Sequence, residues 1–293
     1  QSFLMLGTLV VLPIVGVGEL AQHPEALKAT GAASKSLTGG VGGLAAVGVV
    51  VSGLSWGFGY FGQPHTLTRY MAINDPEQIR LGRWIAITWG VLAFSGAMVI
   101  GIVGALRYGG AEALGDAEQV MPALATELRP GWLAGIFVSG AIAAMMSTAD
   151  SQLLVGTSAV AEDLFHKTLN VDVSPERMVA ISRVVAIGLG IAALLLAYLC
   201  QELVFGLVSY AWGGLGAAFG PVIVLTLYWR RLTGPAVIAS MLTGTVVTVV
   251  WSEVSVLDNA LSARASAFIL ALAVAVVVSL AGTDRQPVSA VAA

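Results

Sequence analysis

Charged side chains are scarce in this chain of 293 residues. Only 11% of its residues are Asp, Glu, Lys or Arg, against about 25% in a typical soluble domain. The net charge of −3 leaves no basic excess for a nucleic-acid surface, and the single cysteine, Cys200, excludes a disulfide framework and a cysteine-built metal site. What the chain has in excess is hydrophobic residues, at 57%. We therefore predict an all-α membrane protein that lies in a lipid bilayer and binds no nucleic acid.

The apolar residues are gathered into stretches long enough to cross a membrane, which takes about 20 residues per helix. Eight such stretches are predicted to span: Ser2–Gly18, Leu44–Gly62, Trp84–Leu106, Trp132–Val155, Met178–Leu199, Val204–Leu227, Ala236–Val250 and Ala265–Ala281. No linker suggests a second domain, so residues 1–293 are predicted to form a single transmembrane domain. An apolar run begins directly after Gln1, and we expect this domain to be incomplete at its N-terminus. The last two stretches show no polar stripe and are predicted to support the others.

Lysine and arginine predict the orientation, because they accumulate in cytoplasmic loops. If the eight stretches alternate in direction, nine of the 14 basic residues fall on one side. These nine are Arg69, Arg80, Arg83, Lys167, Arg177, Arg183, Arg230, Arg231 and Arg285, and the other five are Lys28, Lys35, Arg107, Arg129 and Arg264. We therefore expect the start of the first stretch and the C-terminus to lie in the cytoplasm.

Small and hydroxyl-bearing residues form one narrow stripe on the fourth stretch. The stripe consists of Gly140, Ala144, Ser147, Thr148, Ser151, Val155 and Ser158. Small residues at this spacing let membrane helices approach closely, and the pattern alone favours that interpretation. The alternative is a cation site, in which the hydroxyls of Ser147 and Thr148 and the carbonyl of Ala144 replace part of the hydration shell of Na⁺.

Asp150 is an ionisable residue within the same stretch. Such a residue costs at least about 2.5–3.5 kcal/mol to insert and by default marks a functional or polar site. It lies about 100° from the centre of the stripe and near the predicted cytoplasmic end. A polar gate that includes Asp150 and Ser151 and a direct contact with the ion are both open interpretations.

The second stretch is a poor continuous helix, because residues 53–64 contain four glycines and a proline. Broken helices of this kind form substrate sites at the midplane of transporters. Trp56 and Tyr60 lie four residues apart and therefore share a face just before the predicted break. An aromatic belt at the membrane interface is the alternative for these two residues. In the sixth stretch, Gly216 and Gly220 have the spacing of a close helix contact.

Three segments together resemble the sodium:solute symporter family, and within it the sodium/proline symporters. They are residues 56–65 with Arg69 and residues 71–72, residues 144–154 with residues 162–164, and residues 209–231, and they occur in the family's order. The resemblance implies an inverted-repeat transporter fold, in which the first six stretches are core helices 5 to 10. Core helices 1 to 4 would then lie outside this sequence, and helix 1 would supply further sodium-coordinating carbonyls.

The resemblance also implies roles for individual residues. Ala144, through its carbonyl, and Ser147 and Thr148, through their hydroxyls, would bind sodium. Trp56, Tyr60 and Pro64 would shape the substrate pocket and its gate, with Gln63 as a neighbour.

The implied activity is sodium-coupled uptake of a small organic solute, best matched by L-proline, through alternating access. In this activity Na⁺ is the coupling ion, and neither catalysis nor a cofactor is implied. The resemblance places the protein in the inner (plasma) membrane of a bacterium. The substrate could instead be another amino acid, a carboxylate such as pantothenate, or a sugar acid. In a different class of protein, such a module serves as the sensor of a membrane histidine kinase.

Overall fold

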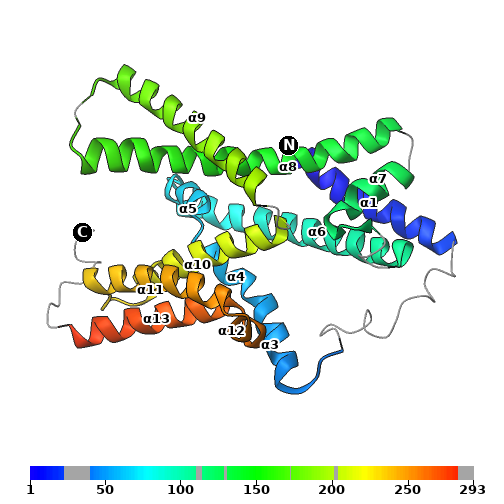
Figure 1. The fold of residues 1–293 in the computed structure, drawn as a ribbon. Helices are drawn as coiled ribbons and strands as arrows, with labels where there is room; N and C mark the ends of the chain where they lie inside the picture. The colour runs from blue at the N-terminus through cyan, green and yellow to red at the C-terminus, as the bar shows by residue number, and fades with distance from the viewer. Residues whose placement is uncertain (23–39, 110–113, 129–130, 172, 201–203, 283–293) are drawn as a thin grey trace. The chain divides into compact units, whose positions relative to one another are not determined.

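The computed structural model describes residues 1–22, 40–109, 114–128, 131–171, 173–200 and 204–282 (Figure 1). Seven of the described helices are long and apolar enough to cross a membrane. An eighth candidate consists of two helical pieces, Ala45–Phe61 and Pro64–Met71, which are bent by 47° relative to each other. The prediction of an all-α membrane protein is therefore confirmed, and each predicted stretch corresponds to one of these candidates. The described helices divide into two compact units.

Unit 1 contains the predicted stripe of hydroxyl-bearing residues. Its helices are α1 (Ser2–Gln22), α6 (Pro76–Tyr108), η3 (Ala117–Gln119), α7 (Val120–Leu128), α8 (Gly131–Ser158), the π-helical η4 (Ala159–Thr168) and α9 (Pro175–Leu199). Helix α6 has clear local signals at both ends. The side chain of Asp75 accepts a hydrogen bond from the backbone N–H of Glu77 at 2.9 Å, Pro76 occupies the first turn, and Gly109 ends the helix with a left-handed φ of 77°. This helix begins eight residues before the predicted stretch at Trp84.

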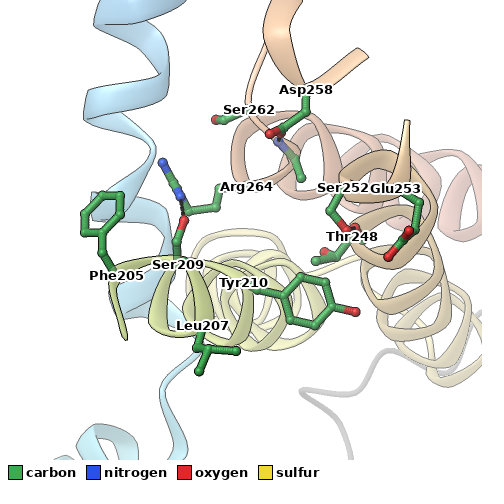
Figure 2. Close-up of a pocket in the computed structure, with 12 residues that line it drawn as sticks. Phe205, Leu207, Ser209, Tyr210, Thr248, Ser252, Glu253, Asp258, Ser262 and Arg264 are labelled. Atoms are coloured by element: carbon green, nitrogen blue, oxygen red, sulfur yellow. Dashed lines mark hydrogen bonds between the residues drawn. The ribbon is translucent and has the colours of Figure 1, made fainter. Parts of the chain in front are cut away.

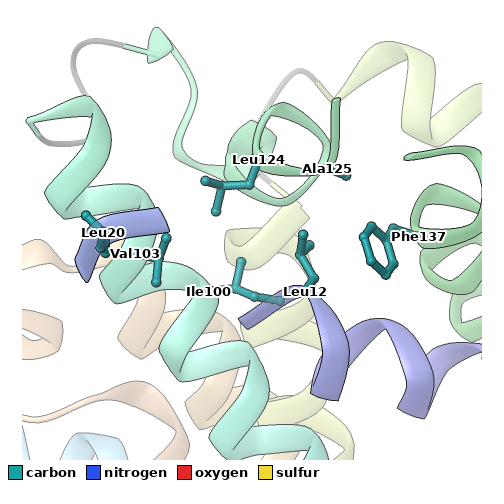
Figure 3. Packing of buried hydrophobic residues seen from close by; sticks show 7 residues of the cluster. All are labelled: Leu12, Leu20, Ile100, Val103, Leu124, Ala125 and Phe137. Carbon is teal, nitrogen blue, oxygen red and sulfur yellow. The ribbon is translucent and has the colours of Figure 1, made fainter. Parts of the chain in front are cut away.

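The core of unit 1 is formed where α1 packs against α6, α7 and α8 (Figure 3). Its buried side chains are Leu12, Leu20, Ile100, Val103, Leu124, Ala125 and Phe137. Close approach of the backbones depends on glycine: a methyl group at Gly96 would overlap the carbonyl oxygen of Leu9. Because lipid is as apolar as these side chains, such close packing is what holds membrane helices together.

Unit 2 contains the predicted broken span. Its helices are α3 (Gly43–Leu54), α4 (Trp56–Phe61), α5 (Pro64–Met71), α10 (Val204–Tyr228), α11 (Gly234–Glu253), α12 (Ser255–Ala260) and α13 (Ala263–Ala281). Helices α10, α11 and α13 pack against one another, and α4 packs against α10 (Figure 1). The core includes Ala217 of α10 and Ala267 and Phe268 of α13.

The prediction that the last two stretches lack a polar stripe is wrong for α11. Ser240, Gly244 and Thr248 recur every four residues and are buried. The hydroxyl of Ser240 donates to the carbonyl of Ala271 on α13 at 3.0 Å, and that of Thr248 donates to the carbonyl of Gly244 at 2.8 Å. A side chain at Gly244 would overlap the backbone of Ala217. The stripe therefore holds α11 tightly against α10 and α13.

Candidate functional site

The predicted break in the second stretch is present, and it has two parts. Helix α3 ends at Leu54 and α4 begins at Trp56, with Ser55 between them; α4 ends at Phe61 and α5 begins at Pro64. Proline has no N–H to donate, so one hydrogen bond of the helix pattern is lost at position 64. The polar groups freed by such a break must find partners inside the protein.

Gln63 supplies partners at this break. Its side chain is 1% exposed, and its amide nitrogen donates to the carbonyl of Gly59 at 3.2 Å and to the carbonyl of Trp212 at 3.4 Å. The first carbonyl belongs to α4 and the second to α10. Gln63 therefore links the end of the broken helix to its neighbour, while Pro64 begins α5 directly after it.

We expect Gln63→Leu to lower the free energy of unfolding by about 1–3 kcal/mol. Leucine fills a similar volume but removes both hydrogen bonds, each of which contributes about 0.5–1.5 kcal/mol in a buried setting. Thermal unfolding of the purified protein in detergent measures the effect. Gln78→Leu, at an exposed position near the start of α6, is the matched control and should leave stability unchanged. Equal stability of the two variants would contradict the linking role of Gln63.

Trp212 on α10 is the central aromatic residue of unit 2, and reasoning from the sequence did not assign it a role. The ring of Tyr60 meets its ring edge-on at a centroid distance of 4.8 Å. Its indole N–H donates to the carbonyl of Trp56 at 3.1 Å. Its ring also covers Gly59, where a methyl group would overlap it. The signal that could have indicated Trp212 is its place within the glycine-rich segment of the sixth stretch.

The two predicted aromatic residues of α4 have different environments. The ring of Tyr60 packs on Trp212 and is 48% exposed. The ring of Trp56 lies 5.4 Å from that of Phe205 on α10 and 4.6 Å from the guanidinium carbon of Arg264 on α13. The structure thus brings Trp56, Tyr60 and Gln63 together beside α10, at the break. Their contact with a substrate stays a prediction.

The three predicted sodium ligands lie together on α8 in unit 1. The carbonyl of Ala144 accepts hydrogen bonds from the hydroxyl of Ser147 at 2.9 Å and from that of Thr148 at 3.3 Å. Both hydroxyl protons point to this carbonyl, which leaves the hydroxyl lone pairs available to a cation. Ala144 and Thr148 also line a shallow hollow with Met145, Ala149 and Gln152. The geometry fits one side of a cation shell, and sodium binding itself stays a prediction.

Close packing, one of the two interpretations that the sequence left open, applies to only part of the stripe on α8. At its N-terminal end Gly140 packs on α1, because a methyl group there would overlap the hydroxyl of Thr8. Further along, Thr148 is exposed and Ser147 is half-buried. Close packing therefore explains the glycine end and leaves the hydroxyl end unexplained.

The two residues of the predicted polar gate lie one turn beyond these oxygens. The hydroxyl of Ser151 donates to the carbonyl of Ser147 at 2.8 Å, and Asp150 is exposed. Both belong to unit 1, whereas the residues at the broken helix belong to unit 2. A gating role for Asp150 and Ser151 stays a prediction.

Apolar helices long enough to cross a bilayer, one of them broken beside clustered aromatic side chains, define a multi-pass membrane protein. The chain belongs to the sodium:solute symporter family, whose sequence model matches residues 1–244. The resemblance found in three short segments is therefore confirmed over most of the chain.

Several relatives are similar to the chain over most of its length. A sodium/proline symporter of Salmonella typhimurium is 37% identical over 266 residues, which cover 88% of this chain and 52% of the relative. A sodium/proline symporter of Escherichia coli is 36% identical (86% and 51% covered), and the high-affinity proline transporter PutP of Bacillus subtilis is 33% identical (88% and 54% covered). The chain thus spans about half the length of these curated relatives. No solved structure matches it.

Proposed function

We propose that this chain is part of a symporter that couples the entry of Na⁺ to the uptake of L-proline by alternating access. The observation that carries the proposal is the 37% identity to a sodium/proline symporter over 88% of the chain. The names of the relatives favour proline over pantothenate, sugar acids and a sensor role. In this proposal the protein acts by binding and moving solutes, without catalysis and without a cofactor. It lies in a bacterial inner membrane with its C-terminus in the cytoplasm.

The proposed sodium ligands are the carbonyl of Ala144 and the hydroxyls of Ser147 and Thr148. Their arrangement in one group on α8 supports this assignment. Trp56, Tyr60 and Pro64 would contact the substrate or close over it, while Gln63 holds the break in place. Asp150 and Ser151 would form a polar gate nearer the end of α8.

One sodium ion is enough to drive accumulation. Moving one charge down a potential of about 100 mV releases about 2.3 kcal/mol. At about 1.4 kcal/mol per factor of ten, this supports roughly 50-fold accumulation of the solute even before any sodium gradient. The proposal therefore needs no second ion site.

The test is uptake of radiolabelled L-proline by the complete gene product, in cells that lack proline uptake of their own. We expect uptake that requires sodium and is abolished by unlabelled proline. Uptake that proceeds equally in sodium and in potassium would overturn the coupling. Sodium-dependent uptake of another amino acid that proline does not inhibit would overturn the substrate and leave the coupling.

A further inference from the structure

Arg264 is a cation in an unfavourable place, at the start of the apolar helix α13. It lies in the first turn of α13, where the helix dipole is positive and repels a positive side chain. A long basic side chain at the end of a membrane helix ordinarily extends towards water. That of Arg264 is instead half-buried within unit 2. The contacts of Arg264 must therefore offset this electrostatic cost.

The guanidinium of Arg264 contacts both sides of the junction between α3 and α4. Its Nε donates to the hydroxyl of Ser55 at 3.3 Å, and its Nη2 donates to the carbonyl of Ser52 at 3.4 Å. Its Nη1 donates to the hydroxyl of Ser209 on α10. Its carbon lies 4.6 Å from the ring centroid of Trp56, close enough for a cation–π interaction. One side chain thus joins α13, the junction and α10.

Ser262, two residues before Arg264, also contacts the junction between α3 and α4. The backbone N–H of Ser262 donates to the hydroxyl of Ser52 at 3.2 Å, and the hydroxyls of Ser55 and Ser262 lie 3.1 Å apart. Ser55 itself is fully buried. The position of the guanidinium relative to Trp56 is therefore fixed by several bonds rather than by one.

The surroundings of Trp56 show what the arginine prevents. Arg264 and Phe205, which both contact the indole of Trp56, line a cavity of about 590 Å³. Figure 2 shows the guanidinium turned towards Phe205 and Ser209 and away from Glu253 on the far wall. Without the arginine side chain, the indole would have free space beside it and no cation at its face.

We propose that Arg264 is a positioning residue, which fixes the indole of Trp56 in the orientation that the substrate site uses. The effect on substrate binding rests on the proposed function, because it takes Trp56 as part of that site. The orientation of the indole is independent of the substrate and is tested separately.

Transport kinetics test the effect on the site in the complete gene product. We expect Arg264→Gln to raise the KM for proline about tenfold while the maximal rate stays within about twofold. The substitution removes a cation–π contact and hydrogen bonds, and the loss of contacts of this kind corresponds to about a factor of ten in affinity. Arg264→Lys keeps the charge and should recover part of the loss. Arg231→Gln, at an exposed position three residues after the end of α10, is the control. If Arg264 acts through Trp56, Arg264→Gln should add little to the KM of a Trp56→Ala variant; a further full tenfold rise would overturn the proposal.

A spectroscopic signature tests the indole without any substrate. The protein is labelled with 5-fluorotryptophan, and the ¹⁹F resonance of Trp56 is identified by its loss in Trp56→Phe. We expect Arg264→Gln to shift or broaden this resonance, whereas Arg231→Gln leaves it in place. The resonance of Trp229, which packs on the core of unit 2, reports whether the unit that contains Arg264 is folded. Arg264→Met, which also removes the charge, serves if the glutamine variant is not folded.

The two experiments separate the two proposals. An unmoved Trp56 resonance in folded Arg264→Gln, or in folded Arg264→Met where the glutamine variant does not fold, overturns the positioning role, whatever the transport result. A moved resonance in the variant, together with a parent protein that takes up no proline, supports the positioning role and overturns the proposed function.

Discussion

Replacing Ser147 and Thr148 together with alanine is expected to raise the sodium concentration for half-maximal proline uptake by about 100-fold or more. Each hydroxyl that binds a charged partner contributes about 1.5–3 kcal/mol, and about 1.4 kcal/mol corresponds to a factor of ten in affinity. Both hydroxyls bond only to the Ala144 carbonyl of their own helix among the contacts described. The double variant should therefore keep the thermal stability of the parent protein. Sodium titration of uptake, beside a melting curve, measures both quantities.

Thr126→Ala is the matched control for this double variant. Thr126 lies on α7 in the same unit, and its hydroxyl donates to the carbonyl of Pro122 at 3.0 Å, as the hydroxyl of Thr148 does to that of Ala144. It should change neither sodium dependence nor stability. If the double variant melts at a lower temperature with unchanged sodium dependence, the stripe serves helix packing along its whole length and the sodium assignment is wrong.

Gly216→Ala is expected to destabilise unit 2 by about 3 kcal/mol, near the upper end of what overpacking costs. The added methyl group would lie 2.5 Å from the Cα of Gly59 and 3.1 Å from its nitrogen. These are backbone atoms of α4, so no side chain can rotate away to make room. The change should lower the unfolding midpoint of the protein in detergent.

Gly214→Ala, two residues earlier on α10, is the matched control. There the methyl group meets only the Cγ2 of Thr248, at an ordinary contact distance of 3.6 Å. Both variants gain about 1 kcal/mol of intrinsic helix propensity, so the difference between them isolates the contact with Gly59. Similar midpoints for the two would mean that α4 and α10 separate easily, against the close approach described here.

The parts of the structure that depend on one helix were predictable from the sequence. Hydropathy located the eight spans because about 20 apolar residues are needed whatever the helix packs against. The helical repeat placed Ala144, Ser147 and Thr148 on one side of α8. The break before Pro64 followed from proline and glycine chemistry, and Gly216 was correctly assigned to close packing.

The parts that depend on which helices are neighbours were not predictable. Trp212 lies 156 residues from Trp56, whose carbonyl it binds, and Arg264 lies 209 residues from Ser55. A periodic pattern indicates which face of a helix is buried but not against what. In the sequence analysis Arg264 was counted only among the charges that predict the orientation. A lone arginine in the first turn of an apolar helix could also have indicated a buried polar contact. The stripe on α11 was missed because Thr243 and Thr245 place further hydroxyls off the stripe, so that hydroxyl residues do not mark a single face of this helix.

The bonds between the α3–α4 junction and the start of α13 also constrain how the protein is made. Ser52 and Ser55 leave the ribosome long before Ser262 and Arg264, and a ribosome that adds about 5–20 residues per second needs about 10–40 s to synthesise the intervening chain. During that interval the junction lacks its final partners. We therefore expect the broken span to complete its shape after insertion of α13. A ribosome stalled before α13 would hold a protein with an immature, protease-sensitive junction.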